Sequence, residues 1–132
     1  MADYFGTSIN ESPTIVLEAG KDIEGAQGIA LAIKDGKAEK PTAGANVIGL
    51  SLFTNDEKVK AGDDVDIQVK DIGKWIAGAA VAVGDELATD AEGKAVKATA
   101  GNFIVAVALS AATEAGSVVK VQLIKAGYKP KE

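Results

Sequence analysis

Two groups of acidic side chains are spaced closely enough to support chemistry. The first group contains Glu57, Asp63, Asp64 and Asp66. Ca²⁺ prefers hard oxygen ligands of this kind, so the group has the composition of a calcium site. The alternative is a solvated turn that leads into a strand whose outward face carries Asp66. We favour the turn and predict no metal site and no cofactor.

The second group contains Asp85, Glu86, Asp90 and Glu92. Two carboxyl groups at a suitable separation can act as acid and base, as they do in glycoside hydrolysis. That chemistry requires an environment that raises the pKa of one of them, and the sequence indicates no apolar pocket around these residues. Glu92 also falls in a predicted turn. We therefore predict no catalytic residue and a protein that is not an enzyme.

Three residue types that carry much of protein chemistry are missing from the sequence. The chain of 132 residues contains no Cys, no His and no Arg. Disulfides, a thiolate nucleophile, a His base and a Cys-ligated zinc ion are thereby excluded. The net charge is −5 and Lys is the only basic residue type. We therefore expect neither nucleic acid nor an anionic membrane surface as a partner.

Targeting and membrane-spanning segments are not expected. The first residues, Met1–Gly6, lack the basic region and the apolar region of a secretory signal. The longest uncharged run, residues 98–113, is shorter than the ~20 residues that span a bilayer. We therefore expect synthesis in the cytoplasm and no membrane partner.

An internal repeat is the most informative feature of the sequence. Residues 34–44 match residues 91–101, and the matched positions are 57 residues apart. After a three-residue deletion, residues 65–69 match residues 119–123 at a spacing of 54. Such self-similarity indicates two structural units of the same kind.

Each unit reads as short strands joined by glycine-containing turns. Asp35-Gly36 is typical of a two-residue hairpin turn, and Glu92-Gly93 is its counterpart in the second unit. Residues 65–69 and 119–123 alternate apolar and polar side chains, which is the period of a half-buried strand. The repeated unit is therefore predicted to be a β-structure.

Two continuous apolar runs, residues 47–53 and 103–109, are typical of strands buried on both faces. A buried helix is an alternative for residues 103–112, but β-branched side chains and flanking glycines favour a strand. The predicted fold is all-β, a small barrel or sandwich built from two related half-repeats, because closure removes exposed sheet edges. We place an N-terminal arm at residues 1–13, the barrel domain at residues 14–127 with halves at about 20–70 and 75–125, and a C-terminal tail at residues 128–132.

Four large apolar side chains are candidate interface residues. Tyr4, Phe5 and Ile9 lie in an arm without a local core, so we predict that they dock on a neighbouring subunit or on a larger assembly. Trp75 is the single Trp of the chain. It either packs at the end of the barrel or across the junction between the halves, or it anchors an interface, as Trp often does. Both interpretations of Trp75 stay open.

The segment from Trp75 to Leu87 carries a recognisable pattern of an aromatic residue, Ala-Gly-Ala, an apolar stretch and Gly-Asp. The elements that follow it are residues 90–96, Thr99-Ala100-Gly101, a short apolar strand ending at Leu109, and Ala115-Gly116 before a final strand. Over about residues 70–127 this order resembles the small β-barrel family of phage capsid cement or decoration proteins. Through the repeat, the resemblance extends to residues 20–70. The family pattern consists of turns and strands, so no functional residue is carried over.

The resemblance implies a structural virion protein that binds the outer surface of an assembled capsid and stabilises the head. Its partner would be the major capsid protein, and it would form a homo-oligomer, a trimer in preference to a dimer. Synthesis would take place in the host cytoplasm, and the protein would lie on the outer capsid surface. The alternative function is a carbohydrate-binding or adhesive module, for example a head fibre or a host-attachment component.

Overall fold

The structure is a computed structural model that describes residues 12–131. The regular elements in this part of the chain are β-strands, and within it no helix is long and apolar enough to cross a membrane. Tyr4, Phe5 and Ile9 lie outside the described residues. The strands are β1 (Thr14–Glu18), β2 (Ile23–Glu24), β3 (Ala30–Lys34), β4 (Lys37–Glu39), β5 (Gly49–Ser51), β6 (Lys58–Val59), β7 (Asp64–Gln68), β8 (Ile72–Ile76), β9 (Glu86–Thr89), β10 (Ala95–Lys97), β11 (Phe103–Ala108) and β12 (Val118–Tyr128).

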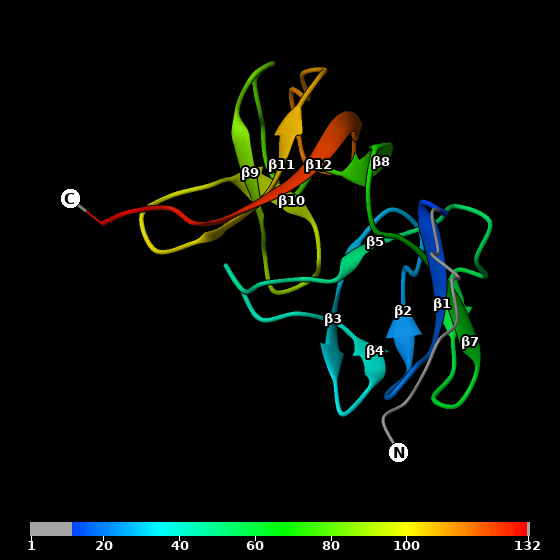
Figure 1. Cartoon of the computed structure of the whole chain (residues 1–132). Coiled ribbons are helices and arrows are strands. Elements are labelled where there is room, and N and C mark those ends of the chain that lie inside the picture. The colour runs from blue at the N-terminus through cyan, green and yellow to red at the C-terminus, as the bar shows by residue number, and fades with distance from the viewer. Residues whose placement is uncertain (1–11, 132) are drawn as a thin grey trace.

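The two halves of the chain form two five-stranded sheets with the same strand order. In the first half the order is β1-β7-β5-β3-β4, and in the second half it is β8-β12-β11-β9-β10. A small third sheet pairs β2 with β6. Figure 1 shows the two large sheets as two lobes, one blue to green and the other green to red. The predicted all-β fold built from two related half-repeats is confirmed.

Each large sheet curls so that its first strand meets its last. A parallel bridge joins Ala19, just after β1, to Ala38 in β4, and the equivalent bridge joins Ala77 to Ala95 in the second half. The strand ladders run within each half, so the halves do not merge into the single shared barrel that the repeat alone suggested. The physical reason is that each half supplies enough strands to satisfy its own edges.

Most local predictions are confirmed, with two exceptions: Glu92 lacks the positive φ of its counterpart Asp35, and only Gly49–Ser51 of the run 47–53 forms a strand. Asp35 and Gly36 both have positive φ, 51° and 78°, as a two-residue type I′ turn requires, and they connect β3 to β4. The apolar run 103–109 forms strand β11, not a helix. In β7, Val65 and Ile67 are buried and their neighbours are more exposed. The alternation places one face of each half on a core.

Two large apolar cores lie under the two sheets, and Ala88, Ala98 and Ile104 form a third, smaller cluster. The first contains Leu31, Val65 and Ile67. The second is centred on side chains from β8, β9, β11 and β12, and it also takes in residues from the first half: Ala30, Val47 and Leu50. The second core therefore crosses the junction between the halves and joins them by burial of apolar surface.

The end of the chain packs on the second half. The backbone carbonyl of Lys129 accepts a hydrogen bond from the Gly101 N–H at 2.9 Å. The backbone N–H of Lys129 donates to the Asn102 carbonyl at 2.7 Å. The Gly101 contact repeats one at the junction, where its counterpart Gly44 donates to the carbonyl of Thr89 at 2.8 Å. Lys129 thus makes with the second half one contact of the kind that Thr89 makes with the first half.

Candidate interaction surfaces

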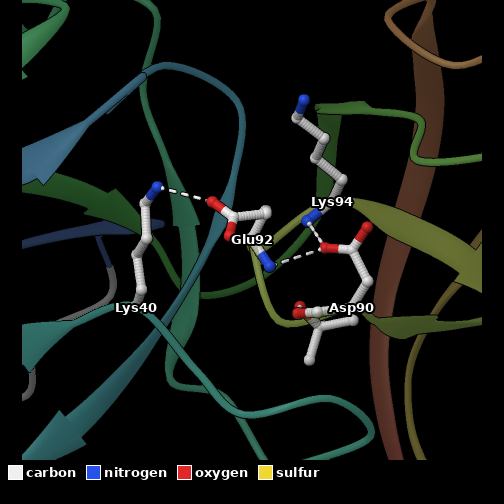
Figure 2. Close-up of polar contacts among 5 residues, drawn as sticks. Lys40, Asp90, Glu92 and Lys94 are labelled. Atoms are coloured by element: carbon white, nitrogen blue, oxygen red, sulfur yellow. Dashed lines mark hydrogen bonds and ion pairs between the residues drawn. The ribbon is translucent and has the colours of Figure 1, made fainter.

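The carboxylates of the second acidic group hold turns. Figure 2 shows one Asp90 carboxylate oxygen accepting the backbone N–H groups of Glu92 and Lys94, at 2.9 and 2.8 Å. Asp85 accepts the backbone N–H of Ala82 at 2.9 Å. These are the bonds by which Asp favours turns, and they give Asp85 and Asp90 a structural role.

In the first acidic group, the backbone of Asp66 is held by the side chain of Asn55. The Asn55 side chain donates to the Asp66 carbonyl and accepts the Asp66 N–H, both at 2.8 Å. The backbone N–H of Asp63 donates to the Lys60 carbonyl at 2.9 Å, which closes the turn before β7. Within residues 12–131, no three side chains of the types His, Cys, Asp and Glu come together in a way that could hold a metal ion.

Trp75 lies at the junction between the halves. Its side chain is completely buried, and its indole N–H donates to the Gly93 carbonyl at 2.7 Å. The same carbonyl accepts the backbone N–H of Ala30, from the first half, at 2.7 Å. Trp75 therefore packs across the junction within the chain, and its ring offers no exposed area to a partner.

An exposed ion pair adds to the junction. Lys40 of the first half lies 3.0 Å from a carboxylate oxygen of Glu92 in the second (Figure 2). The hydrogen bond and the charge of Lys40 lower the pKa of Glu92. Phe103 also donates its backbone N–H to the Gly44 carbonyl at 2.9 Å. Together with the shared core, these contacts make the two halves one body.

A shallow apolar groove runs along β8. We call it the β8 groove; two adjoining hollows that share Ile72, Gly73 and Lys74 form it. Three large apolar side chains on its surface are substantially exposed: Phe53 at 41%, Ile72 at 55% and Val118 at 48%. Polar side chains line the rest of the groove: Ser51, Thr54, Gln68, Lys74, Ser110 and Lys120.

The strand geometry of β8 creates this groove. Successive side chains of a strand point to opposite faces, so Trp75 points into the core while Ile72 and Lys74 point outward. Gly73 lies against the Gln68 side chain, and a Cβ there would come within 2.4 Å of its amide oxygen. The Gln68 amide donates to the Ile72 carbonyl at 2.8 Å, which ties the end of β7 to β8.

A second surface lies at the end of β12, and we call it the tail surface. Tyr128 is 63% exposed, yet its ring packs edge-on against Phe103 at a centroid distance of 5.2 Å. The ammonium group of Lys125 lies 5.9 Å from the centre of the Phe103 ring, and burial lowers the pKa of Lys125. Lys125 also lines a hollow, together with Ile33, Asn46, Val47 and Ile48.

Sequence reasoning missed the exposed residues of both surfaces. Phe53 ends an apolar run and Ile72 begins β8, so neither differs in pattern from a core residue. Tyr128 packs on Phe103, yet the residue is 63% exposed. The one available signal was the outward position of Val118, which alternates with the buried Val119 and Val121 in β12.

Comparisons with known proteins agree with this architecture. The model of the phage cement protein family matches residues 8–123. Among solved structures, the head fiber gp8.5 N base of bacteriophage phi29 has a similar fold, with a TM-score of 0.64 and 19% sequence identity over 90% of this chain and 98% of that chain. A search of curated proteins gives no match. The chain therefore belongs to the phage cement protein family, a family of structural phage head proteins and not of enzymes.

Proposed function

We propose that this protein binds the outer surface of an assembled phage capsid and stabilises the head against rupture. The observation that carries the proposal is the family match, which covers residues 8–123 and therefore both halves. The partner is the major capsid protein, and the protein acts as a homo-oligomer, a trimer in preference to a dimer. It reaches the shell from the host cytoplasm, where it is synthesised.

The physical character of the module supports a mechanical role. Two large cores joined by a hydrogen-bonded junction make one body that transmits force. The hollows on the described surface are shallow. Many weak contacts on a lattice add up to strong attachment, because each subunit holds its neighbours in place for the next contact. The net charge of −5 helps to keep a free subunit soluble before it binds.

The tail surface is the better candidate for contact with the capsid. Its Tyr128 ring is held in position by Phe103 before any partner binds. Binding then costs little side-chain entropy, and Tyr is enriched among residues that dominate binding energy. The β8 groove lies beside Thr14, the first residue of β1, which pairs with the groove residue Gln68.

The test is a titration of purified protein onto capsids of its own phage from which this protein has been stripped. We expect saturation at a fixed multiple of the capsomer number, together with a higher melting temperature of the heads. The multiple distinguishes a trimer on three-fold positions from a dimer on two-fold positions. Absence of saturable binding would contradict the proposal.

A pair of variants tests the surface. Tyr128→Ala is expected to weaken capsid binding at least ~10-fold, as removal of a dominant interface side chain does. Val83→Ala is the control, because Val83 is 66% exposed and lies outside the tail surface. Both variants should keep the melting temperature of the free protein within a few degrees. Equal binding by the two variants would remove Tyr128 from the contact.

A carbohydrate-binding or adhesive role is the second candidate. It is favoured by one observation, the fold shared with a head fiber base. Buried Trp75 cannot stack on a sugar, so the ring to follow is Tyr128, which at 63% is more exposed than Phe53 at 41%. A glycan titration followed by the NMR signals of the Tyr128 ring tests this role. Saturable shifts without capsid binding would favour adhesion, and unchanged signals would count against it.

A further inference from the structure

The two halves carry outward faces of opposite charge at equivalent positions of the repeat. Strands β1 and β7 of the first half correspond to β8 and β12 of the second half in the strand order of the two sheets. In the alignment of the repeat, Asp66 in β7 takes the position of Lys120 in β12. Val16 lies opposite Asp66 in its ladder, and Lys74 lies opposite Lys120. The same place on the fold is therefore acidic in one half and basic in the other.

We call these two surfaces the acidic face and the basic face. The acidic face consists of the outward side chains of β1 and β7: Thr14, Val16, Glu18, Asp64, Asp66 and Gln68. The basic face consists of the outward side chains of β8 and β12: Ile72, Lys74, Ile76, Val118, Lys120 and Gln122. Successive side chains of a strand point to opposite faces, and the buried Val65, Trp75 and Val119 mark the inward side of these strands.

Each face holds two like charges directly across its two strands. Glu18 lies opposite Asp64 on the acidic face, and Lys74 lies opposite Lys120 on the basic face. Like charges at opposed positions of a ladder destabilise it. Lys37 pairs with Glu18 at 2.9 Å, but in the described part of the chain no other ion pair involves a charged group of these two faces. Each face thus has an unbalanced charge that a surface of opposite charge would neutralise.

Exposed apolar side chains lie beside these charges. Val16 is 57% exposed on the acidic face, and Ile72 at 55% and Val118 at 48% are exposed on the basic face. Burial of such side chains favours association, while complementary charges select the surface that is met and set its orientation. The two faces therefore have the composition of the two sides of one interface.

We propose that the acidic face of one copy of this protein binds the basic face of another copy. The two faces lie on different lobes of the chain (Figure 1), so every copy offers both. A cyclic ring joins each subunit to the next through two different surfaces, which is what a trimer requires. The inference deepens the proposed function and rests on it only in naming the surfaces of its homo-oligomer. An acidic segment of the capsid protein is the alternative partner of the basic face.

Exchange of charge between the faces tests this contact. The first variant, Lys74→Glu, Lys120→Glu, makes both faces acidic. The second variant adds Asp64→Lys and Asp66→Lys to the first, which exchanges the charges of the two faces and keeps the net charge at −5. No carboxylate or ammonium group that is changed takes part in an ion pair within the described residues, so the fold should be retained.

A matched control separates the contact from the overall charge. The control variant, Lys34→Glu, Lys97→Glu, changes the net charge by as much as the first variant, at two exposed lysines outside both faces. Circular dichroism and the fluorescence of buried Trp75 verify that each variant is folded.

Analytical ultracentrifugation of the full-length protein at low ionic strength measures self-association. We expect the first variant to raise the dissociation constant of self-association at least ~10-fold above that of the control, because like charges then meet across the contact. The exchange variant should recover most of the lost affinity, since opposite charges meet again. Salt should weaken the association of the natural protein, because it screens the charges of the two faces.

The opposite results overturn the proposal. Equal self-association by the first variant and the control would do so, as would an exchange variant that stays as weak as the first variant. A natural protein that remains monomeric at every concentration would also overturn it. If the first variant loses only its binding to stripped capsids and keeps its self-association, the basic face belongs to the capsid protein. Self-association as expected, without saturable binding of the natural protein to capsids, would instead contradict the proposed function and leave this contact standing.

Discussion

Replacement of Gly93 by Ala tests whether the junction makes the two halves one body. Gly93 has a φ of +82°, and a Cβ at this position would lie 2.6 Å from the Ala30 carbonyl oxygen. Gly36, its counterpart in the repeat, has a φ of +78° and nothing within 4 Å of the Cβ position. The two substitutions thus share the backbone strain and differ in the contact with the other half.

The expected magnitudes follow from this difference. A side chain in the left-handed region costs about 1–2 kcal/mol, and both variants should lose that amount. At Gly93 the backbone must also move, which weakens the two hydrogen bonds that its carbonyl accepts from Ala30 and Trp75. Each such bond contributes about 0.5–1.5 kcal/mol. We therefore expect Gly93→Ala to lose about 1–3 kcal/mol more than Gly36→Ala.

Urea unfolding measures both variants against the natural protein. Trp75 fluorescence reports the junction directly, and circular dichroism reports the sheets. In the natural protein the two signals should change together, since one cooperative unit unfolds. Equal destabilisation by the two substitutions would refute the reasoning, because the contact between the halves would then contribute nothing measurable.

Two further predictions concern the same junction. Lys40 lowers the pKa of Glu92, so the stabilisation by this ion pair is present above pH 4.5 and is lost as the pH falls through the lowered pKa. The melting temperature of Glu92→Gln should therefore lie slightly below that of the natural protein at pH 7 and equal it in acid; a difference that persists in acid would contradict this cause. Trp75→Phe removes the hydrogen bond to Gly93 and some packed volume, and should cost at least ~1 kcal/mol by urea unfolding followed by circular dichroism. An unchanged unfolding midpoint would show that the indole N–H contributes nothing.

Local rules in the sequence determined much of the fold. The alternation in β7 and β12 specifies strands, since successive side chains point to opposite faces. The Asp35-Gly36 turn was predictable because a type I′ turn needs two residues that tolerate positive φ. The repeat predicted two halves of the same kind, and the two halves have the same strand order. The strand periodicity and the turn depend on neighbouring residues alone.

Tertiary structure decided what the sequence left open. Whether the halves share one barrel or curl separately depends on pairing between distant strands. Both arrangements use the same strands, so the sequence pattern of the strands fits either one. Trp75 could equally have been exposed, and only the position of the Gly93 carbonyl gave its indole N–H a buried partner. Phe53, Ile72 and Val118 come together from three segments. Burial is a property of what surrounds a side chain, and the surroundings of these residues come from parts of the chain far away in sequence.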